Sequence, residues 1–255
     1  MSLLLGPALA TPLLKVPILL SNAFLISEAL KPPRSPPREM HRTFKLSDYL
    51  TTGTWVQVTT AAMLRAALSG FMLVDAAVIV SGECALRGIS PEFFERARTF
   101  LLPARANVWG VHLHTTPAFL AGSVLVTAGA LLRISCHRTL GRLFQWQSTV
   151  EPDHELITIG PYAYVRHPSY TALVLLTVGT SLTLLSPGSY AHETRLLTTG
   201  WGKAVVGGLI AWLGTVTGAL ILRIGEEEEE LQKKFGAEWR AWAKRTPYKM
   251  IPYVF

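Results

Sequence analysis

The sequence is poor in charged residues, and this scarcity narrows the class of protein. Only 16% of its 255 residues are Asp, Glu, Lys or Arg, whereas a soluble domain typically carries about 25%. Hydrophobic residues make up 49% of the chain, and the mean hydropathy is +0.32. The composition therefore favours an integral membrane protein over a soluble one.

Cysteine is scarce as well, and the sequence has no basic stripe. Cys84 and Cys136 are too few and too far apart for a disulfide framework or a zinc site, so we expect no metal. The net charge is +7, but the basic residues are scattered through loops. Nucleic-acid binding needs a basic face or a recognisable module, so we expect no nucleic-acid partner. Basic loops fit contact with membrane lipid instead.

Long apolar windows predict an all-α fold, a polytopic transmembrane helix bundle of about five spans. Pro12 and Pro17 should kink the first span. The second is the least secure, because a charge costs about 2.5 to 3.5 kcal/mol at a helix centre; we expect Arg65 and Asp75 within it to face protein. The expected spans are 8–30, 55–80, 116–134, 169–185 and 200–222.

The loops predict a topology. Lys15 interrupts the first window, which also lacks a basic leading region, so we interpret it as a retained span rather than a secretory signal. With the N-terminus outside, the segments 31–50, 134–168 and 223–255 hold most of the loop Lys and Arg residues. The positive-inside rule then places these three segments on the cytosolic side.

The segment between the third and fourth spans is crowded with polar and aromatic groups. From His154 to Tyr170 it holds two His, one Arg and three Tyr. Gly160–Pro161 predicts a turn that lets the backbone approach a ligand, and Pro168 predicts a helix start whose free N–H groups favour a carboxylate. The Tyr faces suit a sulfonium or an adenine, and His167 can donate or accept. Aromatic anchoring of a span is the structural alternative, but this density of groups favours a binding site.

A second polar cluster begins where the fifth span ends. Arg223 is followed by Glu226–Glu230, and Glu227 lies four residues after Arg223, so the two side chains can pair on one helix face. Such a pair would hold the guanidinium ready for a carboxylate. As alternatives, Arg223 is a snorkelling flank residue and the glutamates form a solvated face; we expect at least two of the five to be solvated. Because both clusters fall on the cytosolic side, we expect them to meet.

Taken together, the two clusters resemble the isoprenylcysteine carboxyl methyltransferases. The resemblance covers about residues 133–255 and departs from the family at Thr171, where Gly is usual after the Ser-Tyr pair. The residues that carry it are His154, Leu156, Gly160-Pro161-Tyr162 and Arg166-His167-Pro168-Ser169-Tyr170, followed by Arg223-Ile224, Glu227-Glu228, Leu231 and Phe235-Gly236.

The resemblance implies S-adenosyl-L-methionine as methyl donor and the C-terminal prenylcysteine carboxylate of prenylated proteins as acceptor, at the endoplasmic reticulum with the site facing the cytosol. It also implies a single membrane domain, 1–255, with anchoring spans in 1–132 and a catalytic core in 133–255. The cofactor pocket would form from the 134–168 loop and the C-terminal segment. Arg223 and Glu227 are the catalytic candidates. The cofactor-binding candidates are Gln147, His154, Leu156, Ile157, Gly160, Tyr162, His167, Pro168, Ser169, Tyr170, Glu227 and Glu228.

Two other enzyme classes and a catalytically silent scaffold remain open at this point. A phosphatidylethanolamine-type N-methyltransferase would need a base for its amine acceptor and has less use for a buried Arg. NADPH-dependent sterol reductases have a similar C-terminal end, here Trp239 and 247–253, but they are longer and commonly carry Asn where Ser169 stands. The joint presence of Arg223, Glu227 and His167 argues against a scaffold.

Overall fold

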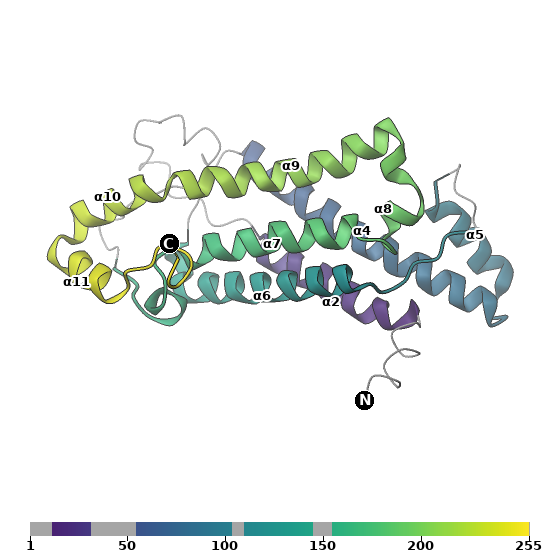
Figure 1. The fold of residues 1–255 in the computed structure, drawn as a ribbon, viewed down its shortest axis with the longest axis horizontal. Coiled ribbons are helices and arrows are strands. Elements are labelled where there is room, and N and C mark those ends of the chain that lie inside the picture. The colour runs from purple at the N-terminus through teal and green to yellow at the C-terminus, as the bar shows by residue number, and fades with distance from the viewer. Residues whose placement is uncertain (1–11, 32–54, 104–109, 145–154, 255) are drawn as a thin grey trace. The chain divides into compact units, whose positions relative to one another are not determined.

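The computed structural model describes residues 12–31, 55–103, 110–144 and 155–254, and every regular element within these ranges is a helix (Figure 1). Five of the helices are long and apolar enough to cross a membrane, as predicted, so the chain is an integral membrane protein. The five long helices are α2 (Lys15–Ala29), α4 (Trp55–Leu86), α6 (Pro117–Leu140), α7 (Pro168–Leu185) and α9 (Gly200–Leu222).

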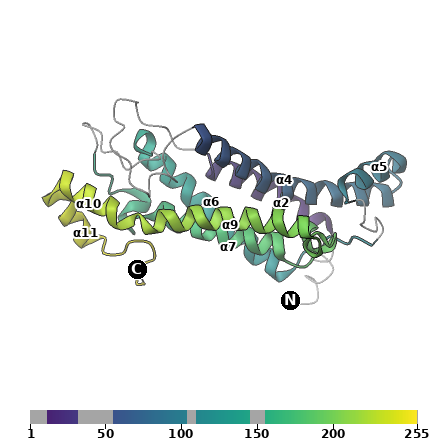
Figure 2. The same cartoon turned by 90° about the horizontal axis from the view of Figure 1, so that it is seen from above.

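Short helices connect and follow the spans. The helix α10 continues the chain directly after α9, and Figures 1 and 2 both show α11 beside α10. The short elements are η1 (Pro12–Leu14), α5 (Pro91–Leu101), η3 (Gly141–Leu143), η4 (Gly160–Ala163), α8 (Tyr190–Glu193), η5 (Leu196–Thr198), α10 (Ile224–Phe235) and α11 (Ala237–Arg245).

The first two spans lie where they were predicted, with differences in detail. Pro12 and Pro17 both lie within the first candidate span, and Pro17 stands in the first turn of α2, where a missing N–H removes no intrahelical hydrogen bond. The second helix continues past residue 80 to Leu86. Within that helix Asp75 is buried as expected, whereas Arg65 is only half-buried.

The described chain packs as two compact units, and the boundaries between them fall within the long helices. The first unit comprises Met1–Ser27, Arg65–Thr127 and Leu176–Trp212, and the second unit comprises Glu28–Leu64, Ala128–Leu175 and Leu213–Phe255.

Close backbone contact and a buried ion pair hold the first unit together. A Cβ atom on Gly122 of α6 would lie 2.8 Å from the carbonyl oxygen of Gly179 in α7, so these helices meet backbone to backbone, as small residues permit in membranes. The Lys15 ammonium of α2 donates to both carboxylate oxygens of Asp75 at 3.1 and 3.0 Å and to Gly188 O at 2.8 Å. This pairing explains how two charges are accommodated within apolar helices.

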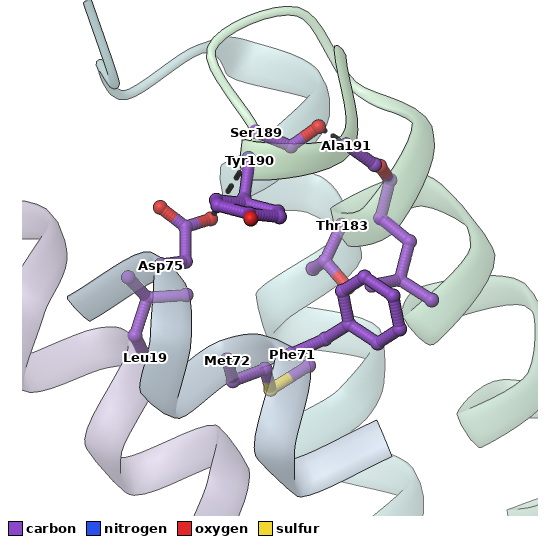
Figure 3. Close-up of a pocket in the computed structure, with 9 residues that line it drawn as sticks. Leu19, Phe71, Met72, Asp75, Thr183, Ser189, Tyr190 and Ala191 are labelled. Atoms are coloured by element: carbon purple, nitrogen blue, oxygen red, sulfur yellow. Dashed lines mark hydrogen bonds between the residues drawn. The ribbon is translucent and has the colours of Figure 1, made fainter. Parts of the chain in front are cut away.

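A small cavity of about 10 Å³ lies beside Asp75 in the first unit (Figure 3). Its wall includes Tyr190, whose ring meets the ring of Phe71 edge to face at a centroid distance of 6.5 Å. The backbone N–H of Tyr190 also donates to Asp75 Oδ2 at 3.4 Å. A space of this volume is about the size that one water molecule needs.

The second unit is centred on a buried cluster of Cys136, Tyr162 and Trp242. These residues come from α6, η4 and α11, so the cluster joins three segments that are far apart in the sequence. The indole Nε1 of Trp242 donates to Tyr162 O at 3.2 Å, which satisfies both polar groups inside the cluster. Partly buried residues packed around it are Leu132, Leu140, Leu156, Ile157 and Trp239.

Candidate active site

The segment that precedes α7 is shaped by a glycine turn. Gly160 has φ of +60°, a conformation that glycine adopts without strain, and it begins the short helix η4. A Cβ atom at Gly160 would approach Thr139 Oγ1 to 3.1 Å, so a larger residue would also crowd α6. The turn places Tyr162 in the buried cluster and leads the chain to Pro168, the first residue of α7.

The predicted meeting of the two polar clusters is confirmed by direct hydrogen bonds. Arg223 is 5% exposed at the junction of α9 and α10, and its Nε donates to Glu227 Oε1 at 3.1 Å, as the i to i+4 spacing predicted. The Tyr170 hydroxyl, from the first turn of α7, donates to the same carboxylate oxygen at 2.6 Å. One carboxylate therefore joins the two clusters.

A second carboxylate extends this network on the other side of His167. Glu228 Oε1 accepts from Arg166 Nε at 2.7 Å, and the Lys249 ammonium lies 3.4 Å from Glu228 Oε2. The imidazole of His167 lies between the two glutamates, with Nδ1 3.5 Å from Glu227 Oε2 and Nε2 3.3 Å from Glu228 Oε1. Opposite charges are therefore interleaved, which is the arrangement that makes buried carboxylates tolerable.

The glutamate run has two largely buried members and two exposed members, which agrees with the expectation that at least two of the five are solvated. Glu227 and Glu228 retain side-chain exposures of only 16% and 13%, whereas Glu226 and Glu229 are exposed. The helix α10 thus turns its two central carboxylates toward α7.

Other predicted site residues lie in the same unit but make different contacts. Leu156 and Ile157 pack against the Cys136–Tyr162–Trp242 cluster, and Ser169 Oγ accepts from Arg133 Nη1 at 2.6 Å. Gln147 and His154 lie outside the described residues. The structure brings most of the candidates together, and their part in cofactor binding stays a prediction.

Tyr162 has a different environment from Tyr170. Burial, reinforced by the neighbouring Cys136 thiol, raises the pKa of the Tyr162 hydroxyl well above its ordinary value of 10.0, so the group stays neutral at physiological pH. Its ring belongs to the buried cluster that supports the site. Tyr164 is 75% exposed.

Arg133 is a buried charged residue for which the sequence predicted no role. It is 8% exposed near the end of α6, and its Nε donates to Ala29 O of α2 at 2.9 Å in addition to the Ser169 bond. Arg133 thereby links the ends of α2 and α6 to the start of α7. Its position inside the third predicted span, where a charge is costly, was the signal that could have identified it.

Comparison with known proteins adds to this geometry. Residues 122–200 match the model of the isoprenylcysteine carboxyl methyltransferase family, a range that contains the first polar cluster. Over this range the chain is similar to the isoprenylcysteine carboxyl methyltransferases. The match ends before Arg223, so the second cluster is joined to the family region through its contacts with Tyr170 and His167.

Named relatives point the same way. The chain is 29% identical to "Protein-S-isoprenylcysteine O-methyltransferase B" of Arabidopsis thaliana, over 52% of this chain and 58% of the relative. It is 26% identical to a probable protein-S-isoprenylcysteine O-methyltransferase of Oryza sativa subsp. indica, over 75% of this chain and 88% of the relative. A Delta(14)-sterol reductase of Mus musculus is 26% identical over 40% of this chain, but over only 20% of its own length.

Proposed function

We propose that this protein transfers a methyl group from S-adenosylmethionine to the C-terminal prenylcysteine carboxylate of prenylated proteins. The observation that carries the proposal is the buried Arg223, held by Glu227 at the point where α10 meets the family motif of α7. A planar guanidinium fixed in this way is suited to recognising a carboxylate. The two methyltransferase relatives carry the same activity in their names.

Residues of the second unit fit the chemistry of the cofactor. Two buried nitrogens of the second unit, His137 Nε2 and Trp239 Nε1, have no hydrogen-bond partner among the described residues and are therefore available to a polar ligand. The carboxylates of Glu227 and Glu228 and the ring of Tyr170 supply negative charge and a π face, both of which attract a cation such as a sulfonium. Bound S-adenosylmethionine would supply an electrophilic methyl group.

The proposed reaction requires correct positioning of the two substrates and no acid–base catalysis. A carboxylate is already ionised at neutral pH, so no general base is needed. Arg223 would orient the acceptor carboxylate, and Glu227 keeps the Arg223 guanidinium in a fixed position. His167, which lies between two carboxylates, would serve as a hydrogen-bonding group that keeps the glutamates in place.

The membrane setting of the proposal follows from the spans and the basic loops. The prenyl chain would reach the site from the bilayer, while the acceptor carboxylate and the cofactor would come from the cytosolic side, where the basic segments are expected. We assign the protein to the endoplasmic reticulum on the resemblance to its family.

In a direct test, the purified protein in lipid nanodiscs is incubated with S-adenosylmethionine that is labelled in its methyl group. Separate reactions contain a farnesylcysteine analogue, phosphatidylethanolamine or no acceptor. We expect base-labile methyl ester to form only with the prenylcysteine. Label in the phospholipid would favour an N-methyltransferase, and binding of NADPH without any methyl transfer would favour the reductase reading that the mouse relative keeps open.

A further inference from the structure

The end of the described chain is bound to the start of α7 through its backbone. We call Thr246–Met250 the C-terminal strap. Five consecutive carbonyl oxygens of the strap accept hydrogen bonds from the segment 166–171. The bonds run from Arg166 Nη1 to Thr246 O and Pro247 O (2.8 and 2.7 Å), from Arg166 N–H to Tyr248 O (3.0 Å), from His167 N–H to Lys249 O (2.7 Å) and from Thr171 Oγ1 to Met250 O (2.7 Å).

These bonds satisfy donors that the helix itself leaves without partners. Arg166 and His167 stand immediately before α7, so their N–H groups lack intrahelical acceptors. The Arg166 guanidinium is buried, and a buried donor without an acceptor costs about 1 to 3 kcal/mol. The strap supplies acceptors for both N–H groups and for the guanidinium, which ties its conformation to the residues that face the glutamates.

Arg166 and His167 bind the strap with one set of nitrogen atoms and face Glu227 and Glu228 with another. Arg166 uses Nη1 for the strap and Nε for Glu228, and His167 uses its N–H for the strap and its ring for Glu227 and Glu228. The Lys249 side chain, from the strap itself, also faces Glu228. A shift of the strap would therefore move every one of these contacts.

We propose that the C-terminal strap is a positioning element of the cofactor site, which sets Arg166 and His167 and through them the carboxylates of Glu227 and Glu228. This inference rests on the proposed function, because it assigns those carboxylates to S-adenosylmethionine. The strap acts through main-chain acceptors, so its own side chains matter less than its presence and its register. Thr171, which stands where the family usually has Gly, adds the bond to Met250 O.

Two truncated proteins form a matched pair for the test. One ends after Arg245 and lacks the strap; the other ends after Ile251 and keeps all five acceptors while losing only the following residues. We expect the first to bind S-adenosylmethionine at least about tenfold more weakly, the equivalent of one or two hydrogen bonds to charged groups. The second should stay within about twofold of the full chain. Amide hydrogen exchange at 166–167 should accelerate only in the first.

A substitution keeps the proposal testable should the shorter protein fail to fold. Arg166→Lys retains a positive charge facing Glu228 but loses the forked guanidinium that also reaches the strap. We expect its KM for S-adenosylmethionine to rise by about tenfold, while the KM for the prenylcysteine changes little.

The outcomes separate the two ideas. Unchanged cofactor affinity, in the protein ending after Arg245 or in Arg166→Lys, would overturn the positioning role and leave the methyltransferase proposal intact. Absence of S-adenosylmethionine binding by the full chain would overturn the proposed function itself. An equal rise in the KM of both substrates of Arg166→Lys would also contradict the proposal, because it would indicate general disruption.

Discussion

The two units of the protein each bury an ion pair, and only one of the pairs has the properties of a working site. In the first unit the Lys15 ammonium is fully buried, contacts two carboxylate oxygens and one carbonyl, and lies 4.8 Å from the centre of the Phe119 ring. The cavity next to Asp75 has room for about one water molecule. The pairing of this cluster is complete, and it holds helices together.

The network of the second unit is built differently. Its carboxylates are shared by donors from the start of α7 and the residues just before it, from Arg223 just before α10, and from the strap. Glu227, Glu228 and Lys249 keep part of their surface exposed. The comparison teaches that burial of charge in a membrane helix does not by itself mark function. Carboxylates that are shared by several donors, stay partly exposed and lie next to a family motif are a better indication of a functional site.

The largest effect should follow the loss of Arg223. Arg223→Ala removes the guanidinium proposed to orient the acceptor, and truncating one partner of a buried charge pair costs about 2 to 5 kcal/mol. We expect methylation of a farnesylcysteine analogue to fall at least about 100-fold, whereas the affinity for S-adenosylmethionine should weaken by only about tenfold, because Glu227 loses one of its partners. Arg240→Ala, at an exposed Arg of α11, is the matched control. Normal turnover by Arg223→Ala would remove this residue from the mechanism.

The next effect separates stability from activity in the first unit. Lys15→Met alone leaves Asp75 buried without its cation, and breaking a buried pair costs about 3 to 5 kcal/mol. We expect a large loss of unfolding free energy in mild detergent, recovered in most part by the double variant Lys15→Met/Asp75→Leu. The fraction that remains folded should methylate at the normal rate. A catalytic defect in the well-folded double variant would mean that the first unit also contributes to the site.

The features that could be predicted are those encoded by residues close together in the sequence. Hydropathy predicted all five spans because a membrane helix is a continuous apolar run. The Arg223–Glu227 pair was predictable because helical spacing alone brings the two side chains together. The meeting of the two clusters followed from placing both on one side of the membrane.

The rest depends on contacts between segments far apart in the sequence. No local sequence pattern predicts that Lys15 pairs with Asp75, which lies 60 residues away. In the sequence, Lys15 is recognisable only as an interruption of an apolar window. Arg133 was missed for the same reason. The resemblance placed the C-terminal segment at the cofactor pocket, but the bonds of the strap were not predicted, because they use main-chain carbonyls that leave no residue pattern. The sequence predicted the chemistry of the side chains, but it did not predict which backbone carbonyls accept hydrogen bonds.

A smaller effect is expected from the hydroxyl that joins α7 to α10. Tyr170→Phe keeps the ring but removes the 2.6 Å bond to Glu227, and a hydrogen bond to a charged group contributes about 1.5 to 3 kcal/mol. We expect cofactor affinity to weaken by about tenfold or somewhat more, measured by equilibrium binding of labelled S-adenosylmethionine. The stability of the first unit should not change. An unaltered affinity would show that the carboxylate is adequately held by Arg223 and His167.

The smallest effect should come from the motif tyrosine that belongs to the supporting cluster. Tyr162→Phe preserves the ring that packs with Cys136 and Trp242, and the Trp242 bond goes to the main-chain oxygen of residue 162, which the substitution retains. Because the raised pKa keeps the hydroxyl neutral, its removal should leave the pH profile of methylation unchanged between about pH 7 and 9. We expect KM for S-adenosylmethionine to change by less than about threefold, within the range of one neutral hydrogen bond. A change as large as that of Tyr170→Phe would instead place the Tyr162 hydroxyl in direct contact with the cofactor, and the division between supporting and binding tyrosines would have to be redrawn.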